Sequence, residues 1–309
     1  MISFRTDLAE ELRTHAMGGR DRELSGIRYL ERTEDDIRIS TVDITHETGE
    51  RELGKPKGRY VTLTFGGEET LFGSGFFTLC DKLAREIRAL LKDAKSILVV
   101  GLGNGDLSAD AVGVIAASFV PATRHLKKED AAWFQKSGLF DLSVLFPYDA
   151  AKMGIDTLSL VRFAIKDLRP DAVIAVDALA ARDSARLLRT IQLANTGIIP
   201  GSGLGRGQAA LNEKTLGVPT LAIGVPTVVD TETLLRDALQ QAGLSSDLAE
   251  SPLRGFVSSK DVDVTVKNMG KLIGFSIGRA FHTALSYEEL LTLLTNCLHL
   301  MLPCTQTKK

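Results

Sequence analysis

Two aspartates have the sequence setting of catalytic carboxylates. Asp110 follows the apolar stretch at residues 96–104 (SILVVGLGN), and Asp177 follows the apolar stretch at residues 172–176 (AVIAV). Apolar, β-branched runs of this length are typical of buried parallel strands, and open α/β sheets bind their ligands at the carboxyl ends of such strands. We therefore expect the two side chains to face one crevice, where a carboxylate pair can perform acid–base catalysis.

Each aspartate also has a purely structural interpretation. Asp110 lies two residues after Ser108, a predicted helix N-cap, and the helix dipole stabilises a carboxylate there by about 0.3–1 kcal/mol. Asp177 would itself cap the helix that is predicted to follow it. Composition and spacing alone leave open whether the two side chains meet.

The elements that must position these aspartates alternate between helix and strand. Apolar periodicity and cap signals predict helices at residues 76–92, 108–120, 155–168 and 180–189, and strands at residues 97–100, 173–176, 191–193 and 220–223. This alternation predicts an α/β fold with a mostly parallel sheet between two layers of helices. Two further helices are expected at residues 262–285 and 287–302, after a long surface loop at residues 243–255.

A different pattern comes before this core. Residues 36–44 and 59–65 alternate apolar and polar side chains, and a turn-forming stretch, GKPKG at residues 54–58, comes between them. These segments are predicted to be antiparallel strands of a small accessory sheet. We expect a single α/β domain over residues 1–309, with residues 36–66 as its β accessory element.

Composition excludes several classes of protein. The 309 residues are 44% hydrophobic and 25% charged, with a net charge of −2, which favours neither nucleic-acid binding nor attraction to anionic membranes. No apolar run has the length of a membrane span, and the first residues lack the apolar core of a signal peptide, so we expect a soluble cytoplasmic protein. Cys80, Cys297 and Cys304 form no C-x-x-C pair, which indicates neither a disulfide framework nor a zinc site.

Competing active-site motifs are incomplete. The glycine-rich segments at residues 101–106 and 203–208 have Asp106 and Gln208 where a dinucleotide loop has its third glycine. Ser202 lacks the flanking glycines of a nucleophile elbow. The histidines show no metal-binding spacing on a helix; they are His15, His46, His125, His282 and His299. We therefore expect no cofactor and no bound metal.

The chain resembles the spore germination proteases, endopeptidases that cleave small acid-soluble spore proteins when spores germinate. The resemblance rests on several long segments in the family's order, at residues 4–9, 99–104, 174–182, 195–205, 215–230, 256–263 and 277–285. It implies a phosphorylase/hydrolase-like core similar to that of hydrogenase maturation proteases. It also implies a homotetramer located in the forespore or spore core, with small acid-soluble spore proteins as its partners.

The resemblance further implies that the family's catalytic aspartates correspond to Asp110 and Asp177. One ionised aspartate would act as a general base on water, and one protonated aspartate would donate a proton. The residues do not tell which aspartate takes which role, because a coupled pair titrates as a unit.

Family substrates are cut beside a glutamate, so the resemblance implies a cation near the cleft. The candidates are Arg182, five residues after Asp177, and Arg124. Each arginine is equally compatible with a surface position or a local ion pair. Gly201, Ser202 and Gly203 are expected to line the cleft, where backbone N–H groups can face a substrate.

The chain departs from the family in three places. Family zymogens carry a propeptide ahead of the segment that begins at Arg5, whereas only four residues precede Arg5 here, so inhibition by a removable pro-segment is left open for this chain. Ile199 stands where the family has a histidine, and residues 146–156 replace a more glycine-rich segment.

Two other functions stay open at this point. A metal-dependent maturation-type protease of the related fold would need a third ligand, usually histidine, near the aspartate pair. A non-catalytic relative would keep the fold as a binding module, although the presence of both aspartates argues against it.

Overall fold

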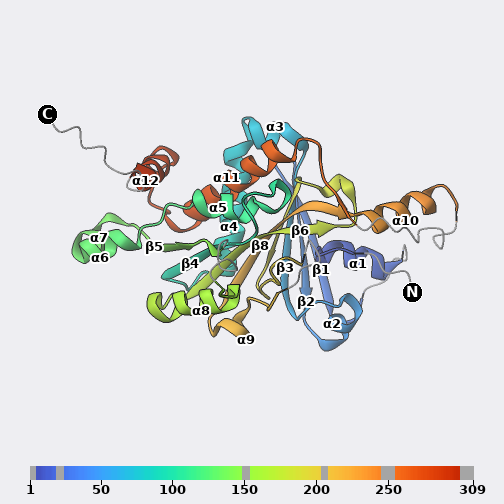
Figure 1. The fold of residues 1–309 in the computed structure, drawn as a ribbon, viewed down its shortest axis with the longest axis horizontal. Helices are drawn as coiled ribbons and strands as arrows, with labels where there is room; N and C mark the ends of the chain where they lie inside the picture. Colours follow the sequence, from blue (N-terminus) through green and yellow to red (C-terminus); the bar gives the residue numbers. More distant parts are fainter. Residues whose placement is uncertain (1–4, 19–23, 148–153, 203–207, 245–254, 300–309) are drawn as a thin grey trace.

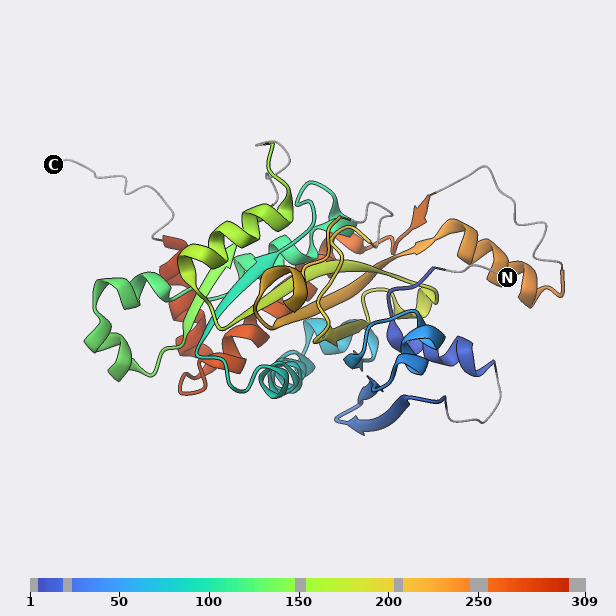
Figure 2. The same cartoon turned by 90° about the horizontal axis from the view of Figure 1, so that it is seen from below.

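The computed structural model describes residues 5–18, 24–147, 154–202, 208–244 and 255–299, and the strands within these residues form one sheet (Figures 1 and 2). The strands are β1 (Ile27–Glu34), β2 (Ile37–Ile44), β3 (Gly58–Thr64), β4 (Ser96–Gly101), β5 (Asp141–Leu145), β6 (Ala172–Ala181), β7 (Thr190–Ala194), β8 (Thr220–Asp230) and β9 (Phe256–Val257). Their spatial order is β1-β2-β3-β7-β8-β6-β4-β5, and β9 pairs with β8.

Helices cover both faces of this sheet. They are α1 (Ala9–Met17), α2 (Glu47–Leu53), α3 (Gly67–Phe72), α4 (Gly75–Leu90), α5 (Val112–Ser118), α6 (Arg124–Glu129), α7 (Ala131–Ser137), α8 (Thr157–Leu168), α9 (Glu213–Leu216), α10 (Thr231–Gln241), α11 (Val262–Phe281) and α12 (Tyr287–His299). Two short 3-10 turns, η1 (Ser108–Asp110) and η3 (Ser184–Arg186), follow β4 and β6. No helix in the described part of the chain is long and apolar enough to cross a membrane.

The sheet is mixed rather than mostly parallel. Pairing is parallel along β8-β6-β4-β5 and antiparallel along β1-β2-β3-β7-β8. The predicted antiparallel strands at residues 36–44 and 59–65 are confirmed as β2 and β3, but the expectation that they form a separate accessory sheet is wrong. They continue the main sheet, because β3 pairs with β7 from Tyr60↔Ala194 to Thr64↔Thr190.

Burial explains why β2 and β3 join the main sheet. Along β2, Ile37 and Ile39 pack into the large core on one face, whereas Val42 and Ile44 pack into a second cluster on the other face. A strand with apolar side chains on both sides must be covered on both sides. The continuous sheet provides this cover, with α1 and α2 near one face of β2 and α4 on the other (Figure 1).

Alternate residues of β6 divide the interior in the same way. Ile174 and Val176 face the large core beneath α4, α5 and α11. Val173 and Ala175 face a smaller cluster on the opposite side of the sheet, which packs against α8 and α9. Figure 1 shows α5 and α11 above the strands and α8 and α9 below them. We call the side covered by α8 and α9 the lower face.

Most predicted elements are confirmed, with two exceptions near the aspartates. The predicted helix at residues 180–189 is wrong, because β6 continues to Ala181 in register with β8 and only the turn η3 follows; sheet pairing overrides the local preference for helix. The helix predicted at residues 108–120 begins at Val112 instead, after η1, so Ser108 does not cap it. Most of the loop predicted at residues 243–255 lies outside the described residues.

Candidate active site

Asp177 lies inside a buried strand and not at its end. Every residue of β6 is buried, and Asp177 is 1% exposed. By alternation its side chain lies on the lower face, between Ala175 and Leu179, which belong to two separate apolar clusters. A carboxyl group in such surroundings is costly to ionise unless it is paired. The folded surroundings therefore determine whether Asp177 is protonated.

The neighbours of Asp177 favour its protonated form. Its Oδ1 accepts the Ala178 N–H at 2.9 Å, and its Oδ2 accepts the Gly201 N–H at 3.2 Å. Burial is the largest cause that raises the pKa of Asp177 to about 8, and the negative charge of Asp110 adds to it, while the two N–H donors act in the opposite direction. The Asp177 carboxyl therefore keeps its proton to a higher pH than an ordinary aspartate does.

The charge of Asp110 acts on Asp177 because β4 is shorter than β6. Gly101, the last residue of β4, is opposite Val176, and the Leu102 N–H still donates to the Val176 carbonyl at 2.8 Å. β4 thus stops one residue before Asp177, and the loop that carries Asp110 follows directly. The predicted position after a strand end is confirmed for Asp110, on the loop after β4. It is wrong for Asp177, which lies inside β6 and comes level with that loop because β4 ends there.

Asp110 is held by its own loop. The Asn104 N–H donates to Asp110 Oδ2 at 3.0 Å, and the Thr227 hydroxyl of β8 donates to the Ala109 carbonyl at 2.6 Å. Gly103 has a φ of +95°, and a Cβ there would lie 2.0 Å from the Asp110 carbonyl oxygen, so glycine is required at this position. Asp110 is half-buried and thus more accessible to solvent than Asp177.

Helix α5 packs directly on the strand that carries Asp177. A Cβ at Gly113 would lie 2.2 Å from the Val176 carbonyl oxygen and 2.4 Å from the Leu102 carbonyl oxygen. This close approach fixes the first turn of α5, and with it η1, over the end of β4. The backbone on both sides of the carboxylate pair is therefore tightly constrained.

Asp7 is a third carboxylate near the pair, and the sequence analysis did not single it out. The Asp7 N–H donates to the Ala180 carbonyl at 2.9 Å, and the Ala180 N–H donates to Asp7 Oδ2 at 2.9 Å. Its charge also raises the pKa of Asp177, as the smallest of the causes. The signal that would have found it is its position in the segment at residues 4–9, which carries the family resemblance.

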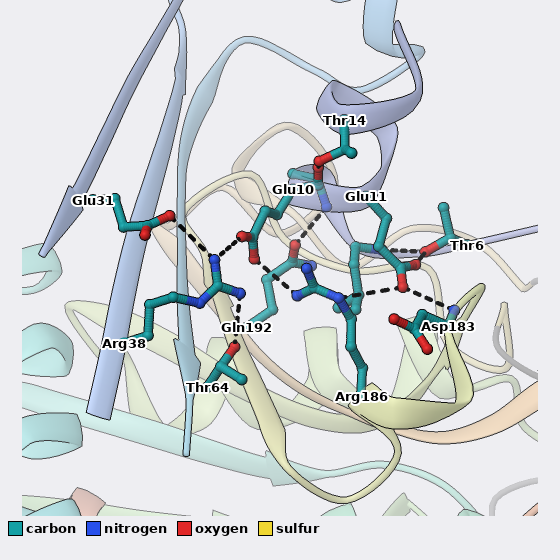
Figure 3. A network of polar contacts seen from close by, with 12 residues as sticks. Thr6, Glu10, Glu11, Thr14, Glu31, Arg38, Thr64, Asp183, Arg186 and Gln192 are labelled. Carbon is teal, nitrogen blue, oxygen red and sulfur yellow. Dashed lines mark hydrogen bonds and ion pairs between the residues drawn. The ribbon is translucent and has the colours of Figure 1, made fainter. Parts of the chain in front are cut away.

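A buried ion-pair network holds the chain next to Asp7 (Figure 3). Glu10 of α1 accepts from Arg38 at 2.5 Å and from Arg186 at 2.8 Å, and Glu11 accepts the Asp183 N–H at 3.0 Å. Both glutamates are buried, so their charges depend on these partners. The network attaches α1 to β2 and to the turn that follows β6.

The two arginine candidates lie in ion pairs of their own. Arg182 donates to Asp237 at 2.6 and 3.1 Å, beside a cavity of about 1070 Å³ between α1 and α10, beyond the end of β6. Arg124, at the start of α6, donates to Asp141 at 3.0 Å and to the Leu168 carbonyl at 2.6 Å. The structure thus places both guanidinium groups in local contacts rather than beside the aspartate pair.

The three candidates of the glycine-rich segment, Gly201, Ser202 and Gly203, do not all lie at the site. Gly201 contacts the site through its N–H bond to Asp177. Ser202 and Ile199 line a cavity of about 210 Å³ on the lower face. Gly203 lies outside the described residues. Among the residues that the structure describes, no group of three His, Cys, Asp or Glu side chains has an arrangement able to hold a metal ion.

The chain is similar in sequence to known germination proteases. A family model described as germination protease matches residues 5–242. The germination protease of Clostridium perfringens (strain ATCC 13124) is 38% identical over 246 residues, covering 77% of this chain and 74% of that protein. The germination protease of Caldanaerobacter subterraneus subsp. tengcongensis is 34% identical over 325 residues, covering 95% and 99%. That of Bacillus velezensis is 40% identical over 245 residues, covering 76% and 66%.

Among solved structures, a [NiFe] hydrogenase maturation protease, HycI from Thermococcus kodakarensis KOD1, aligns with a TM-score of 0.33 and 15% identity. The alignment covers 62% of this chain and 98% of that one.

Proposed function

The chain belongs to the germination protease family and is thus a peptidase acting in spore germination; from this premise we propose that it hydrolyses small acid-soluble spore proteins with Asp110 and Asp177 as an acid–base pair. The observation that carries the proposal is the contrast between the two carboxyl groups. Asp177 is 1% exposed with a raised pKa, whereas Asp110 is half-buried beside it. Environments that separate two carboxyl groups in this way assign the acid and the base.

In the first step, the Asp110 carboxylate takes a proton from a water molecule, and the oxygen of that water attacks the carbonyl carbon of the scissile peptide bond. Asp177 donates its proton to the carbonyl oxygen, which gives a neutral tetrahedral intermediate. The protonated Asp110 then passes its proton to the amide nitrogen as the C–N bond breaks. Asp177 recovers a proton from a hydroxyl of the intermediate as the new carboxyl group forms, so both residues return to their starting states.

Substitution of each aspartate tests this assignment. Purified protein is incubated with a small acid-soluble spore protein, and the fragments are identified by mass spectrometry. We expect Asp110→Asn and Asp177→Asn each to lower the cleavage rate at least about a hundredfold, since general acid–base groups contribute factors of this size. Asp106→Asn, in the same loop as Asp110 but exposed, is the matched control and should cleave normally.

Equal cleavage by wild type and both variants would remove the aspartate mechanism. Metal analysis of the active protein tests the maturation-type alternative, because one bound metal per chain would contradict a mechanism that uses the aspartate pair alone.

Location in the forespore or spore core and assembly as a homotetramer are part of the same proposal. Light scattering after size-exclusion chromatography tests the tetramer.

A further inference from the structure

The cavity of about 210 Å³ on the lower face lies next to Asp177. Gly224 of β8 is the register partner of Asp177, and both Gly224 and Leu179 line the cavity. On its other side, Ser202 follows Gly201, whose N–H binds Asp177. The cavity is smaller than the roughly 300–1000 Å³ of a site for a drug-sized ligand, so its size suits one amino-acid side chain.

Lys55 brings a positive charge to this cavity. It lies in the turn between α2 and β3, which the sequence indicated only as a turn. The turn is anchored at both ends: the Gly54 N–H donates to the Glu50 carbonyl at 2.7 Å, and the Tyr60 hydroxyl donates to the Pro56 carbonyl at 2.8 Å. Lys55 is therefore presented from a fixed backbone.

The Lys55 ammonium has unused hydrogen-bonding capacity. The described residues offer it no hydrogen bond and no ion pair within 4 Å, although the side chain is half-buried. Burial lowers the pKa of Lys55, and the negative charge of Asp7 partly opposes this effect. Asp7 is itself engaged with the Ala180 N–H. A ligand carboxylate gains most binding free energy from a half-buried ammonium group that has no close partner in the protein.

The walls of the cavity suit the aliphatic part of an acidic side chain. Leu179 of β6, Ala194 of β7 and Ala222 of β8 provide apolar surface, and Ile198 from the segment after β7 adds to it. The methylene groups of a glutamate would lie on this surface, with the carboxylate directed at the ammonium. A neutral glutamine would fit the same space but would lack the charge-assisted hydrogen bond.

We propose that Lys55 is a specificity-determining residue that binds the carboxylate of an acidic substrate side chain next to the scissile bond, in the cavity beside Asp177. The inference rests on the proposed function for its substrate, a peptide. It replaces Arg182 and Arg124 as the source of the positive charge, because both of those guanidinium groups bind carboxylates of the protein itself.

A binding experiment tests the proposal without any need for cleavage. The full chain carrying Asp177→Asn is titrated into fluorescent octapeptides that are identical except for Glu, Gln or Lys at one central position, and anisotropy is recorded. We expect the Glu peptide to bind about ten- to a hundredfold more tightly than the Gln peptide, the range for one hydrogen bond to a charged group. Adding Lys55→Met should bring this ratio close to one, and adding Lys55→Glu should favour the Lys peptide.

Lys57→Met is the matched control, because Lys57 is an exposed lysine of the same turn that does not line the cavity. It should keep the preference for Glu. Equal binding of the Glu and Gln peptides by the protein with Lys55 intact, or an unchanged ratio after Lys55→Met, would overturn the proposal.

Cleavage assays separate this proposal from the proposed function. If the wild type cuts spore proteins and Lys55→Met keeps the Glu to Gln ratio in kcat/KM, only the role of Lys55 fails. If the Glu preference in binding depends on Lys55 but nothing is cleaved, the inference holds for the cavity and the proposed function fails.

Discussion

Asp177 lies one residue beyond the point at which β4 ends, and the charge of Asp110, on the loop after β4, raises the pKa of Asp177. One carboxyl group is therefore supplied by a rigid strand and the other by a constrained turn. Burial keeps the first protonated, and partial exposure leaves the second able to reach water. This asymmetry has consequences for pH dependence, stability and packing.

Activity should fall as the pH rises through about 8. Above this value Asp177 loses the proton that it must donate, because the pKa of Asp177 is raised to about 8. The rate constant for cleavage, measured from pH 6 to 10 with a peptide substrate, should show this loss in kcat. A kcat that stays constant to pH 10 would contradict the role of Asp177 as acid.

Removal of the Asp110 charge should lower the pKa of Asp177. The second largest cause of the raised pKa is repulsion from Asp110, which Asp110→Asn abolishes, while the larger effect of burial remains. Carboxyl ¹³C NMR titration of the wild type and Asp110→Asn measures the shift directly. The same titration of the exposed-loop variant Asp106→Asn should reproduce the wild-type curve.

Asp177 should make the protein less stable as the pH rises from about 4 to about 8. Below pH 4 the carboxyl is protonated in both states; above it the unfolded chain ionises while the native protein keeps its proton. The unfolded state then binds fewer protons, so the free energy of unfolding decreases by up to about 1.4 kcal/mol per pH unit in this window. Urea unfolding at several pH values should show a smaller decrease for Asp177→Asn than for the wild type.

His282 should make the protein less stable as the pH falls below about 6.5, whereas Asp177 makes it less stable as the pH rises. It is fully buried, its Nδ1 accepts the Phe140 N–H at 3.1 Å, and burial lowers the pKa of His282 to about 4. The contribution of His282 to the free energy of unfolding is complete above about pH 6.5. It is lost as the pH falls towards 4, since only the unfolded chain takes up the proton in this range. The free energy of unfolding of His282→Gln should vary less than that of the wild type over this range, whereas the exposed variant His46→Gln should follow the wild type.

Gly113→Ala should disturb both stability and the site. The added Cβ meets the backbone oxygens of Val176 and Leu102, neither of which can rotate away, so we expect a loss of about 1–3 kcal/mol or more. Displacement of η1 should also lower the cleavage rate. Gly105→Ala is the control, because the nearest atom to its new Cβ is a Val114 methyl at 3.7 Å. Equal unfolding midpoints for the two variants would refute the close contact.

Arg186→Met should destabilise the region around Asp7. The substitution removes the guanidinium group that pairs with Glu10 and Glu11, so their buried negative charges are less well neutralised. In comparable buried pairs, removal of one partner lowers the free energy of unfolding by about 3–5 kcal/mol. Hydrogen exchange of the Asp7 and Ala180 amides should then become faster. Asp81→Asn, which removes the charge from the more exposed pair with Arg279, should change the unfolding free energy by less than about 1 kcal/mol.

Local patterns in the sequence determined much of the fold. The apolar runs at residues 97–100 and 173–176 became β4 and β6, and the helical periodicity at residues 76–92 became α4, because both signals depend on neighbours within one or two turns of chain. The family segments likewise pointed to Asp110 and Asp177.

Only the tertiary structure decided how these parts form a site. The effect of Asp110 on Asp177 depends on β4 stopping opposite Val176, and the position of Lys55 depends on β3 pairing with a strand more than a hundred residues away. The sequence also cannot show that Arg182 and Arg124 are occupied by Asp237 and Asp141. Strand register, burial and ion pairing are set by contacts between distant segments, and no local pattern of residue types records them.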